Sequence, residues 1–302
     1  MTTPPTRPLV GFATCAEVPD LEDDDRLPIP YLEAMGVDVE PAVWDDPEVD
    51  WTAYDLVVVR ETWDYPRRRD AFLAWARSVP RLANPADVLA WNTDKTYLGD
   101  LAARGIPVVR SDFLAPGDQA RVESALARPG EHVVKPSVGA GSVDALRCDL
   151  SDPAQAATAR AHARRLLGEG RTVLVQPYLE DVDHHGETAL LYVDGRFSHA
   201  IRKGPLLTGP HDLVEGLYKQ EEIEARSPSP AERALADRVV AEVPGVAGLL
   251  YARVDLLPGP DGTPQLLELE LAEPSLFLGF SDGAPRRLAE AIAARVGVGR
   301  GR

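Results

Sequence analysis

Three acidic residues lie within two neighbouring apolar stretches near the end of the chain. Asp255 stands in V-D-L-L, and Glu268 and Glu270 stand two residues apart in L-L-E-L-E-L. Pro258–Thr263 separates the stretches and has the composition of a turn, which predicts a hairpin. Residues two apart in a strand point to the same face, so the hairpin gathers carboxylates on one side. Such an oxygen-rich site suits Mg²⁺, whereas a hairpin whose acids face water would need no metal.

A second set of residues is suited to binding phosphate groups. Lys135 ends the apolar stretch H-V-V-K, and Gly139–Ser142 follow as a G-A-G-S loop. Glycine lets backbone N–H groups approach phosphate oxygens closely. The pattern is not the P-loop G-x-x-x-x-G-K-[ST], and a loop of this kind alone can be a simple turn. Lys95 falls on the first turn of an expected helix, where a lysine is ordinarily solvated.

Two further stretches could complete a nucleotide pocket. Arg171–Glu180 predicts a strand, and its end, Gln176–Leu179, can offer backbone N–H and C=O groups to an adenine edge. Glu187–Tyr192 and Arg196–Lys203 predict a hairpin, because the Asp-Gly pair between them is a strong turn signal. This hairpin ends in a basic Arg-Lys pair. His184 and His185, which precede this hairpin, do not have the spacing of metal ligands.

A polar and aromatic cluster follows the third expected strand, with the sequence R-E-T-W-D-Y. Ligands bind outside the carboxyl ends of strands in open α/β sheets. Arg60 could therefore clamp a substrate carboxylate with two parallel hydrogen bonds, with Trp63 and Asp64 beside it. This composition suits an amino-acid-like substrate. The alternative is an Arg–Asp pair that caps the following helix.

The order of expected elements places these residues in an α/β protein. Strand and helix alternate along the first part of the chain, which predicts a small α/β lobe built from Pro8–Thr14, Leu27–Met35, Val37–Trp44 and Tyr54–Arg60. No G-x-G-x-x-G follows the first strand, which counts against a dinucleotide-binding domain. Leu206–Ala225 has no periodicity and predicts a loop, and Ala284–Val296 predicts a terminal helix. The 302 residues suit two or three lobes.

Composition narrows the class of partner. The net charge is -16 and 44% of the residues are hydrophobic, which argues against nucleic acid or an anionic membrane surface as the main partner. Cys15 and Cys148 form neither a disulfide framework nor a zinc signature. The chain shows no signal segment and no apolar run of about 18 residues, so we expect a cytoplasmic protein.

The order of these motifs resembles the ATP-grasp superfamily, in the branch that contains glutathione synthetase, D-alanine–D-alanine ligase and the ribosomal-protein glutamate ligases. The motifs are, in chain order, Lys95, V-V-K-P with the glycine-rich loop, Q-P-Y-L, G-E, R-x-D and E-x-E-x-x-x-P. Finer features are similar to the group that includes the O-ureido-serine cyclo-ligase of D-cycloserine biosynthesis. These features are R-x-T-W-D-Y, W-N-T-D-K, H-A-I-R-K and E-L-E-x-x-E-P-S-L-F.

The resemblance implies an α/β (α+β) fold of the ATP-grasp type. Residues 1–90 would form an N-terminal Rossmann-like substrate domain, and residues 91–302 the ATP-grasp region, with a central lid over about residues 112–180 and a C-terminal lobe. Relatives of this branch are often homo-oligomers. The expected cofactors are ATP and Mg²⁺, with two metal ions.

The resemblance also implies roles for individual residues. The ATP phosphates and the loop that closes over them would involve Lys95, Lys135, Gly139, Gly141 and Ser142. The adenine and ribose would contact Gln176, Tyr178, Leu179 and either Asp183 or Glu187. The metal ligands would be Asp255, Glu268 and Glu270, although relatives commonly have Asn where this chain has Glu270. Arg202 would neutralise the γ-phosphate or the acyl-phosphate. Candidates for substrate contact are Arg253 and Ser275, which flank the metals, together with Arg60, Trp63 and Asp64.

The implied activity is a ligase reaction. ATP would convert a substrate carboxylate to an acyl-phosphate, and a nitrogen nucleophile would displace the phosphate. If the cyclo-ligase resemblance holds, both groups belong to one molecule, and O-ureido-D-serine would close to D-cycloserine. Otherwise the enzyme would join two molecules, as a peptide or amino-acid ligase does. A phosphotransferase without acyl transfer is the remaining alternative.

Overall fold

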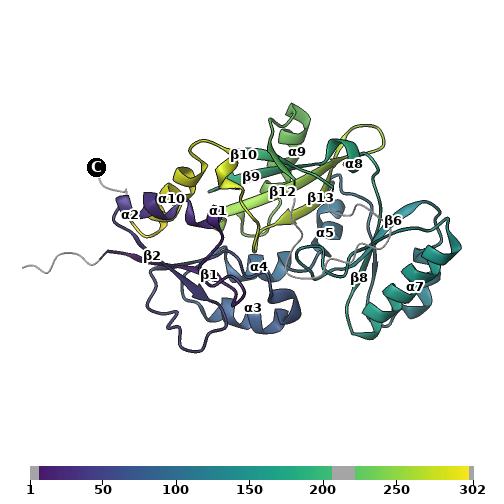
Figure 1. Ribbon diagram of the computed structural model, residues 1–302, viewed down its shortest axis with the longest axis horizontal. Helices are drawn as coiled ribbons and strands as arrows, with labels where there is room; N and C mark the ends of the chain where they lie inside the picture. Colours follow the sequence, from purple (N-terminus) through teal and green to yellow (C-terminus); the bar gives the residue numbers. More distant parts are fainter. Residues whose placement is uncertain (1–6, 206–221, 299–302) are drawn as a thin grey trace, which may run out of the picture.

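The computed structural model describes residues 7–205 and 222–298. Three β-sheets with helices on their faces make up an elongated molecule, and they follow one another along the chain (Figure 1). Across the described residues, no helix is both long enough and apolar enough to cross a membrane.

The first sheet is parallel and has the strand order β2-β1-β3-β4. Its strands are β1 (Leu9–Thr14), β2 (Asp38–Val43), β3 (Leu56–Val59) and β4 (Leu82–Ala83). The helical elements of this part are α1 (Asp23–Arg26), α2 (Ile29–Ala34), the 3-10 turn η1 (Tyr65–Arg67), α3 (Arg69–Ser78) and α4 (Ala86–Asn92). The central strand β3 is buried throughout, as its uninterrupted apolar sequence predicts for a sheet covered on both faces.

The second sheet is antiparallel and has the order β5-β8-β6-β7. Its strands are β5 (Asp112–Leu114), β6 (Glu131–Pro136), β7 (Leu146–Asp149) and β8 (Val173–Pro177). The helix α7 (Pro153–Gly168) packs its alanine and leucine face on this sheet, and the side chain of Asp152 caps its first turn. The shorter helical pieces are α5 (Tyr97–Ala103), which precedes β5, η2 (Asp118–Arg121) and α6 (Val122–Ala125).

The third sheet has the order β11-β10-β9-β12-β13. Its strands are β9 (Glu187–Val193), β10 (Arg196–Lys203), β11 (Ile223–Ala225), β12 (Tyr251–Pro258) and β13 (Pro264–Glu270). Both predicted hairpins, β9–β10 and β12–β13, are therefore confirmed. The predicted loop at 206–225 is wrong for its last three residues, which pair with β10, and residues 206–221 lie outside the described part. The helical elements here are α8 (Val182–His185), α9 (Pro230–Ala241), η3 (Val246–Gly248) and η4 (Leu278–Phe280).

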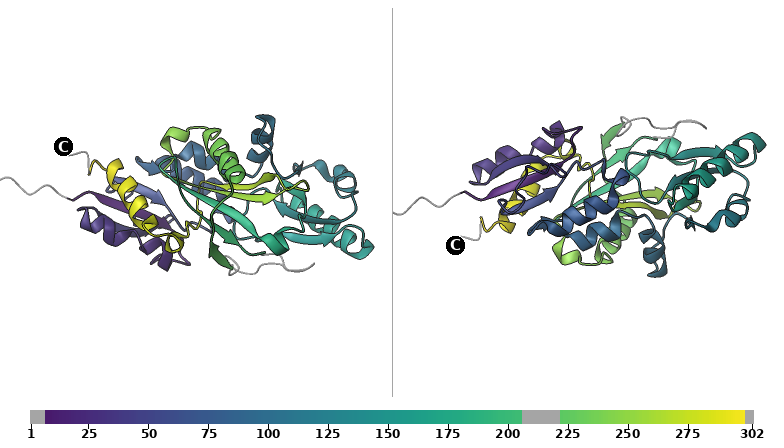
Figure 2. Two further views of the ribbon diagram at one scale, coloured as in Figure 1. Left: turned by 90° about the horizontal axis from the view of Figure 1, so that it is seen from above. Right: turned by 90° about the horizontal axis from the view of Figure 1, so that it is seen from below.

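The last helix, α10 (Ala284–Arg295), returns to the first sheet. Leu288 and Ile292 are fully buried in one apolar core with Val10 and Phe12 of β1 and with Leu32 of α2. Figure 2 shows α10 beside the N-terminal strands and helices in both views. The division of the chain at residue 90 stays a prediction, and α10 lies on the N-terminal side of it in space.

Candidate active site

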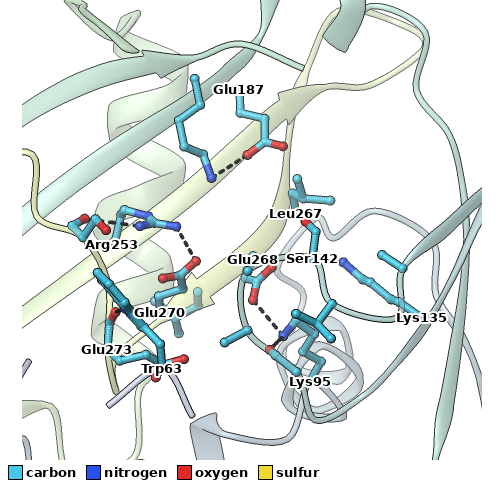
Figure 3. A pocket seen from close by; sticks show the side chains of 18 of the residues that line it. Trp63, Lys95, Lys135, Ser142, Glu187, Arg253, Leu267, Glu268, Glu270 and Glu273 are labelled. Carbon is cyan, nitrogen blue, oxygen red and sulfur yellow. Dashed lines mark hydrogen bonds and ion pairs between the residues drawn. The ribbon is translucent and has the colours of Figure 1, made fainter. Parts of the chain in front are cut away.

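A cavity of about 930 Å³ lies where the three sheets meet. β13 forms its floor, β6 and the loop that follows it form one wall, and residues from the end of β3 and from the segment after β13 form the opposite wall. Figure 3 shows the charged side chains of both walls directed into this space. Most of the residues proposed from the sequence converge here.

The β12–β13 hairpin presents its charged side chains on one face. Arg253 pairs across the ladder with Glu270, and Asp255 pairs with Glu268. Because side chains alternate along a strand, all four point to the same side. The prediction that the three carboxylates share a face is therefore confirmed by the register of the strands.

Each of these carboxylates faces a cation of the protein. Glu268 lies 3.0 Å from Lys95 Nζ, and Glu270 forms an ion pair with Arg253. Asp255 accepts from Lys203 Nζ at 2.7 Å and from Arg253 Nε at 3.0 Å. Within the described residues, no group of three His, Cys, Asp or Glu side chains is arranged to hold a metal ion. The donor set itself is nevertheless of the hard oxygen type that Mg²⁺ takes.

The environment separates the pKa values of the two glutamates on β13. Burial raises the pKa of Glu270 to about 7, against the opposing charge of Arg253. Burial also acts to raise the pKa of Glu268, but the charges of Lys95 and Lys135 outweigh it and lower that pKa. Glu268 is therefore the more strongly ionised of the pair at neutral pH.

Two lysines line the wall opposite the hairpin. Lys95 is buried, and its Nζ donates to the carbonyl of Gly139 at 2.7 Å, which links it to the glycine-rich loop. Lys135 points into the cavity (Figure 3) and has no ion-pair partner among the residues that the structure describes. Burial lowers the pKa of Lys135. Because no ion pair holds its ammonium among the described residues, Lys135 is available to an anionic group such as a phosphate.

The other residues proposed for nucleotide contact lie around this wall. The lining includes Gly139, Gly141 and Ser142 of the loop, and Gln176, Tyr178 and Leu179 at the end of β8. Glu187 also lines the cavity and lies 2.9 Å from Lys203 Nζ. Asp183 is not part of the lining: it accepts from the hydroxyl of Tyr178 at 2.5 Å and pairs with Arg147.

The basic pair at the end of β10 divides between two faces. Arg202 points away from the cavity, and its guanidinium donates to the carbonyls of His185 and His184 at 2.7 and 3.1 Å. Its neighbour Lys203 lines the cavity because adjacent residues of a strand point to opposite sides. The geometry therefore favours Lys203 over Arg202 for contact with a phosphate. The Arg-Lys pair is visible in the sequence, but the alternation of side chains along a strand does not say which of the two residues faces the cavity.

In the R-E-T-W-D-Y cluster after β3, some side chains line the cavity and others are buried away from it. Trp63 lines the cavity, whereas Arg60 is only 1% exposed and does not. Arg60 pairs with Asp25 at 2.8 Å, so it cannot clamp a substrate carboxylate without leaving that partner. Asp64 is buried as well and accepts from Trp44 Nε1 at 2.8 Å. The proposed clamp is therefore absent from this geometry, whereas Asp64 pairs with Arg68 at 2.5 Å just before α3, as the alternative of an Arg–Asp pair beside that helix expects.

Arg60 and three other side chains fasten the backbone that follows β13. The carbonyls of four consecutive residues, 271 to 274, each accept a hydrogen bond from a buried or half-buried side chain. The donors are, in order, Asn84 at 2.7 Å, Tyr251 at 2.8 Å, Trp63 at 3.1 Å and Arg60 at 2.9 Å. We call residues 271–274 the anchored segment. It joins the acidic hairpin to the end of the first sheet.

Several cavity residues were not proposed from the sequence. Besides Lys203, they include Glu61, Tyr65 and Glu273. Glu61 is 1% exposed and accepts from the backbone N–H of Glu22 at 2.9 and 3.0 Å. Glu273 appears in the E-L-E-x-x-E-P motif, but its direction depends on the anchored segment and could not be found from the motif alone.

Comparison with known proteins identifies the class. Residues 10–84 match the family model of the N-terminal domain of D-cycloserine synthetase DcsG. The cycloserine biosynthesis protein DcsG of Streptomyces lavendulae is 40% identical over 284 residues, which cover 88% of this chain and 93% of that protein. A crystal structure of D-cycloserine synthetase DcsG superposes with a TM-score of 0.84 at 36% identity and covers 95% of this chain and 99% of that one. A RimK domain ATP-grasp protein from Sphaerobacter thermophilus superposes with a TM-score of 0.66 at 19% identity, with 95% and 98% covered, which shows the shared fold.

The fold and the site together define an ATP-grasp enzyme, and the protein is an ATP-dependent carboxylate–amine ligase. Enzymes of this class use ATP and Mg²⁺ and act on small-molecule or peptide carboxylates. Within the class, the chain belongs to the DcsG family. The predicted ATP-grasp fold and the resemblance to the cyclo-ligase group are both confirmed.

Proposed function

We propose that the protein closes a ring within one amino-acid-like molecule, with O-ureido-D-serine as the substrate and D-cycloserine as the final product. The observation that carries this proposal is the convergence of Lys95, Lys135 and Lys203 on one acidic hairpin inside a single cavity. Such a site can hold a triphosphate and a carboxylate together. The similarity to DcsG over most of the chain supports the choice of substrate.

The ATP phosphates would lie on the lysine side of the cavity. Lys135 has a free ammonium there among the described residues, and Lys95 already contacts the glycine-rich loop at Gly139. Glu268, Glu270 and Asp255 would hold two Mg²⁺ ions, which supply neutralisation of phosphate charge when bound. The ion pairs of these carboxylates with Lys95, Arg253 and Lys203 keep their charges balanced in the absence of ligands.

The chemistry follows from these positions. A carboxylate oxygen of the substrate attacks the γ-phosphorus of ATP, and ADP leaves. The nitrogen bonded to the side-chain oxygen of the same molecule then attacks the acyl carbon, a C–N bond forms, and phosphate leaves. The ring nitrogen still carries the carbamoyl group, and hydrolysis of that group to CO2 and NH3 gives D-cycloserine. Arg253 lies beside Glu270 and donates to the carbonyl of Ser275 at 3.2 Å, so its charge is near the place where the acyl group would react. Closure of the loop 139–142 would keep water from the acyl-phosphate.

A coupled assay tests this function. ADP release with Mg·ATP is measured over O-ureido-D-serine, amino acids and small carboxylates, and products are weighed by mass spectrometry. A product made from one substrate molecule supports ring closure. A product that joins two molecules would make the enzyme an intermolecular ligase, and a stable phosphorylated product would make it a phosphotransferase. Either of the last two results overturns the proposal.

A further inference from the structure

Glu273 differs from the three carboxylates of the β12–β13 hairpin because no ion pair with a cation joins it among the described residues. Glu268, Glu270 and Asp255 each form an ion pair with a lysine or an arginine. Glu273 has no such ion pair among the residues described; burial and then the charge of Glu270 raise its pKa to about 8, and the nearby hydroxyl of Tyr65 acts to lower it. A carboxylate that lines a cavity without a counter-charge is suited to a cationic ligand.

The backbone beneath Glu273 is held in place. Its own carbonyl accepts from Trp63 Nε1, and the carbonyls on either side accept from Tyr251 and Arg60. Tyr65 is 3% exposed, so packing holds its hydroxyl near the carboxylate. A side chain supported in this way is pre-organised for a ligand, because binding costs little further ordering.

The surroundings of Glu273 favour an ammonium group. Trp63 and Tyr65 are aromatic neighbours that line the same end of the cavity, and an ammonium interacts favourably with aromatic faces. Figure 3 shows Glu273 with Trp63 and Arg253, across the cavity from Lys95 and Lys135. A molecule whose carboxylate lies toward Arg253 and whose amine, on the neighbouring carbon, reaches Glu273 would match this distribution of charge.

We propose that Glu273 is the residue that binds the amino group of the small substrate, and that Tyr65 positions its carboxylate. This inference rests on the proposed function, because it concerns the substrate of that reaction. It specifies the substrate class as molecules with a free amine beside the carboxylate that is activated. Molecules in which this amine is missing or acylated are then poor substrates.

The test compares two substrates and two proteins. O-ureido-D-serine and the same molecule without its α-amino group are assayed with the wild-type enzyme and with Glu273→Gln. We expect kcat/KM for the amine-bearing substrate to fall about 100-fold in the variant, mainly through KM, as for loss of one partner of a charge-assisted contact. The value for the molecule without the amine should change less than about 3-fold.

Two further variants separate positioning from binding. Tyr65→Phe keeps the ring and removes the hydroxyl, so it should raise KM for the amine-bearing substrate by about 5-fold and leave kcat and its pH profile unchanged. Glu290→Gln removes one negative charge on the outer face of α10, where Glu290 pairs with Arg286, and should change neither parameter. This variant controls for the loss of net charge.

The outcomes distinguish this inference from the function on which it rests. If Glu273→Gln slows both substrates equally, or lowers kcat with a shifted pH profile, Glu273 does not bind the amine and acts in the chemistry or the fold instead. If wild-type enzyme releases no ADP with O-ureido-D-serine, the proposed function fails, and this inference fails with it. Selective loss for the amine-bearing substrate supports it.

Discussion

The two ends of the cavity balance their charges in different ways. At the lysine end, the carboxylates of the hairpin face Lys95, Lys203 or Arg253, so the acids and bases compensate each other. At the aromatic end, Glu61 and Glu273 lie in the cavity wall without an ion-pair partner among the described residues. In the proposed function, the first end receives the negative phosphates and the metal ions. At the second end, neither glutamate has an ion pair among the described residues, which suits a cationic ligand.

The two ends also depend differently on the chain. The lysine end is built mostly from the second and third sheets, where strand alternation groups Glu268 with Glu270, and the connection between α4 and α5 adds Lys95. The aromatic end combines the end of β3 with the anchored segment, about 210 residues later, through the contact of Trp63 with Glu273. Local sequence therefore determines one end, and long-range packing determines the other.

The largest effect is expected at the lysine end. Glu268→Gln keeps the size of the side chain and removes the charge that faces Lys95, so a metal ligand would be weakened. We expect kcat to fall by about 1000-fold or more. ADP release measures the loss, and thermal unfolding measures the fold. A variant that kept wild-type rates would show that Glu268 holds no metal in the reaction.

A smaller loss should distinguish the two members of the Arg-Lys pair. Lys203→Met removes the cation that lines the cavity, and we expect kcat/KM to fall about 100-fold. Arg202→Met removes a guanidinium that contacts only the backbone of residues 184 and 185 among its described partners, and should cost less than about 5-fold. Steady-state kinetics of both variants decide the question. A larger loss for Arg202→Met than for Lys203→Met would mean that Arg202, and not Lys203, contacts the phosphate.

The smallest effect concerns the pH dependence of stability at the aromatic end. Burial and then the charge of Asp25 raise the pKa of Glu61 from 4.5 to about 8. The folded protein therefore favours the protonated form, so the stability that Glu61 contributes is complete below pH 4.5 and is lost as pH rises through about 8.

Glu61→Gln should remove this dependence. The variant should be about as stable as the wild type near pH 4.5 and more stable than it above pH 8, by more than about 1 kcal/mol. Urea unfolding of both proteins across this range measures the difference. Equal pH profiles for the two proteins would mean that Glu61 is ionised in the folded state and that the aromatic end tolerates its charge.

Sequence reasoning located the hairpin because the relevant pattern is local. Alternation every second residue places Glu268 and Glu270 on one face whatever surrounds them, and the turn at 258–263 supplies their partner strand. The same reasoning could not choose between Arg202 and Lys203, because each fits one of two faces. The face becomes known only when β9 and β11 are placed beside β10.

Arg60 shows where local reasoning ends. Its position at the carboxyl end of β3 is a good indication of a crevice, and Trp63 nearby does line the cavity. The partner of Arg60, however, is Asp25. Asp25 precedes β2 in the chain, whereas Arg60 follows β3. A buried arginine takes whichever carboxylate the fold brings to it, so motif reading alone gave it the wrong neighbour.

The anchored segment has a consequence for how this enzyme can be recombined with its relatives. An exchange of residues 1–90 alone would not transfer substrate choice, because Arg60, Trp63 and Asn84 donate to carbonyls of residues 271–274. Leu288 and Ile292 of α10 also belong to the core of the first sheet. The segments that must be exchanged together are therefore separated in the sequence. A working chimera must carry residues 271–295 together with the N-terminal part.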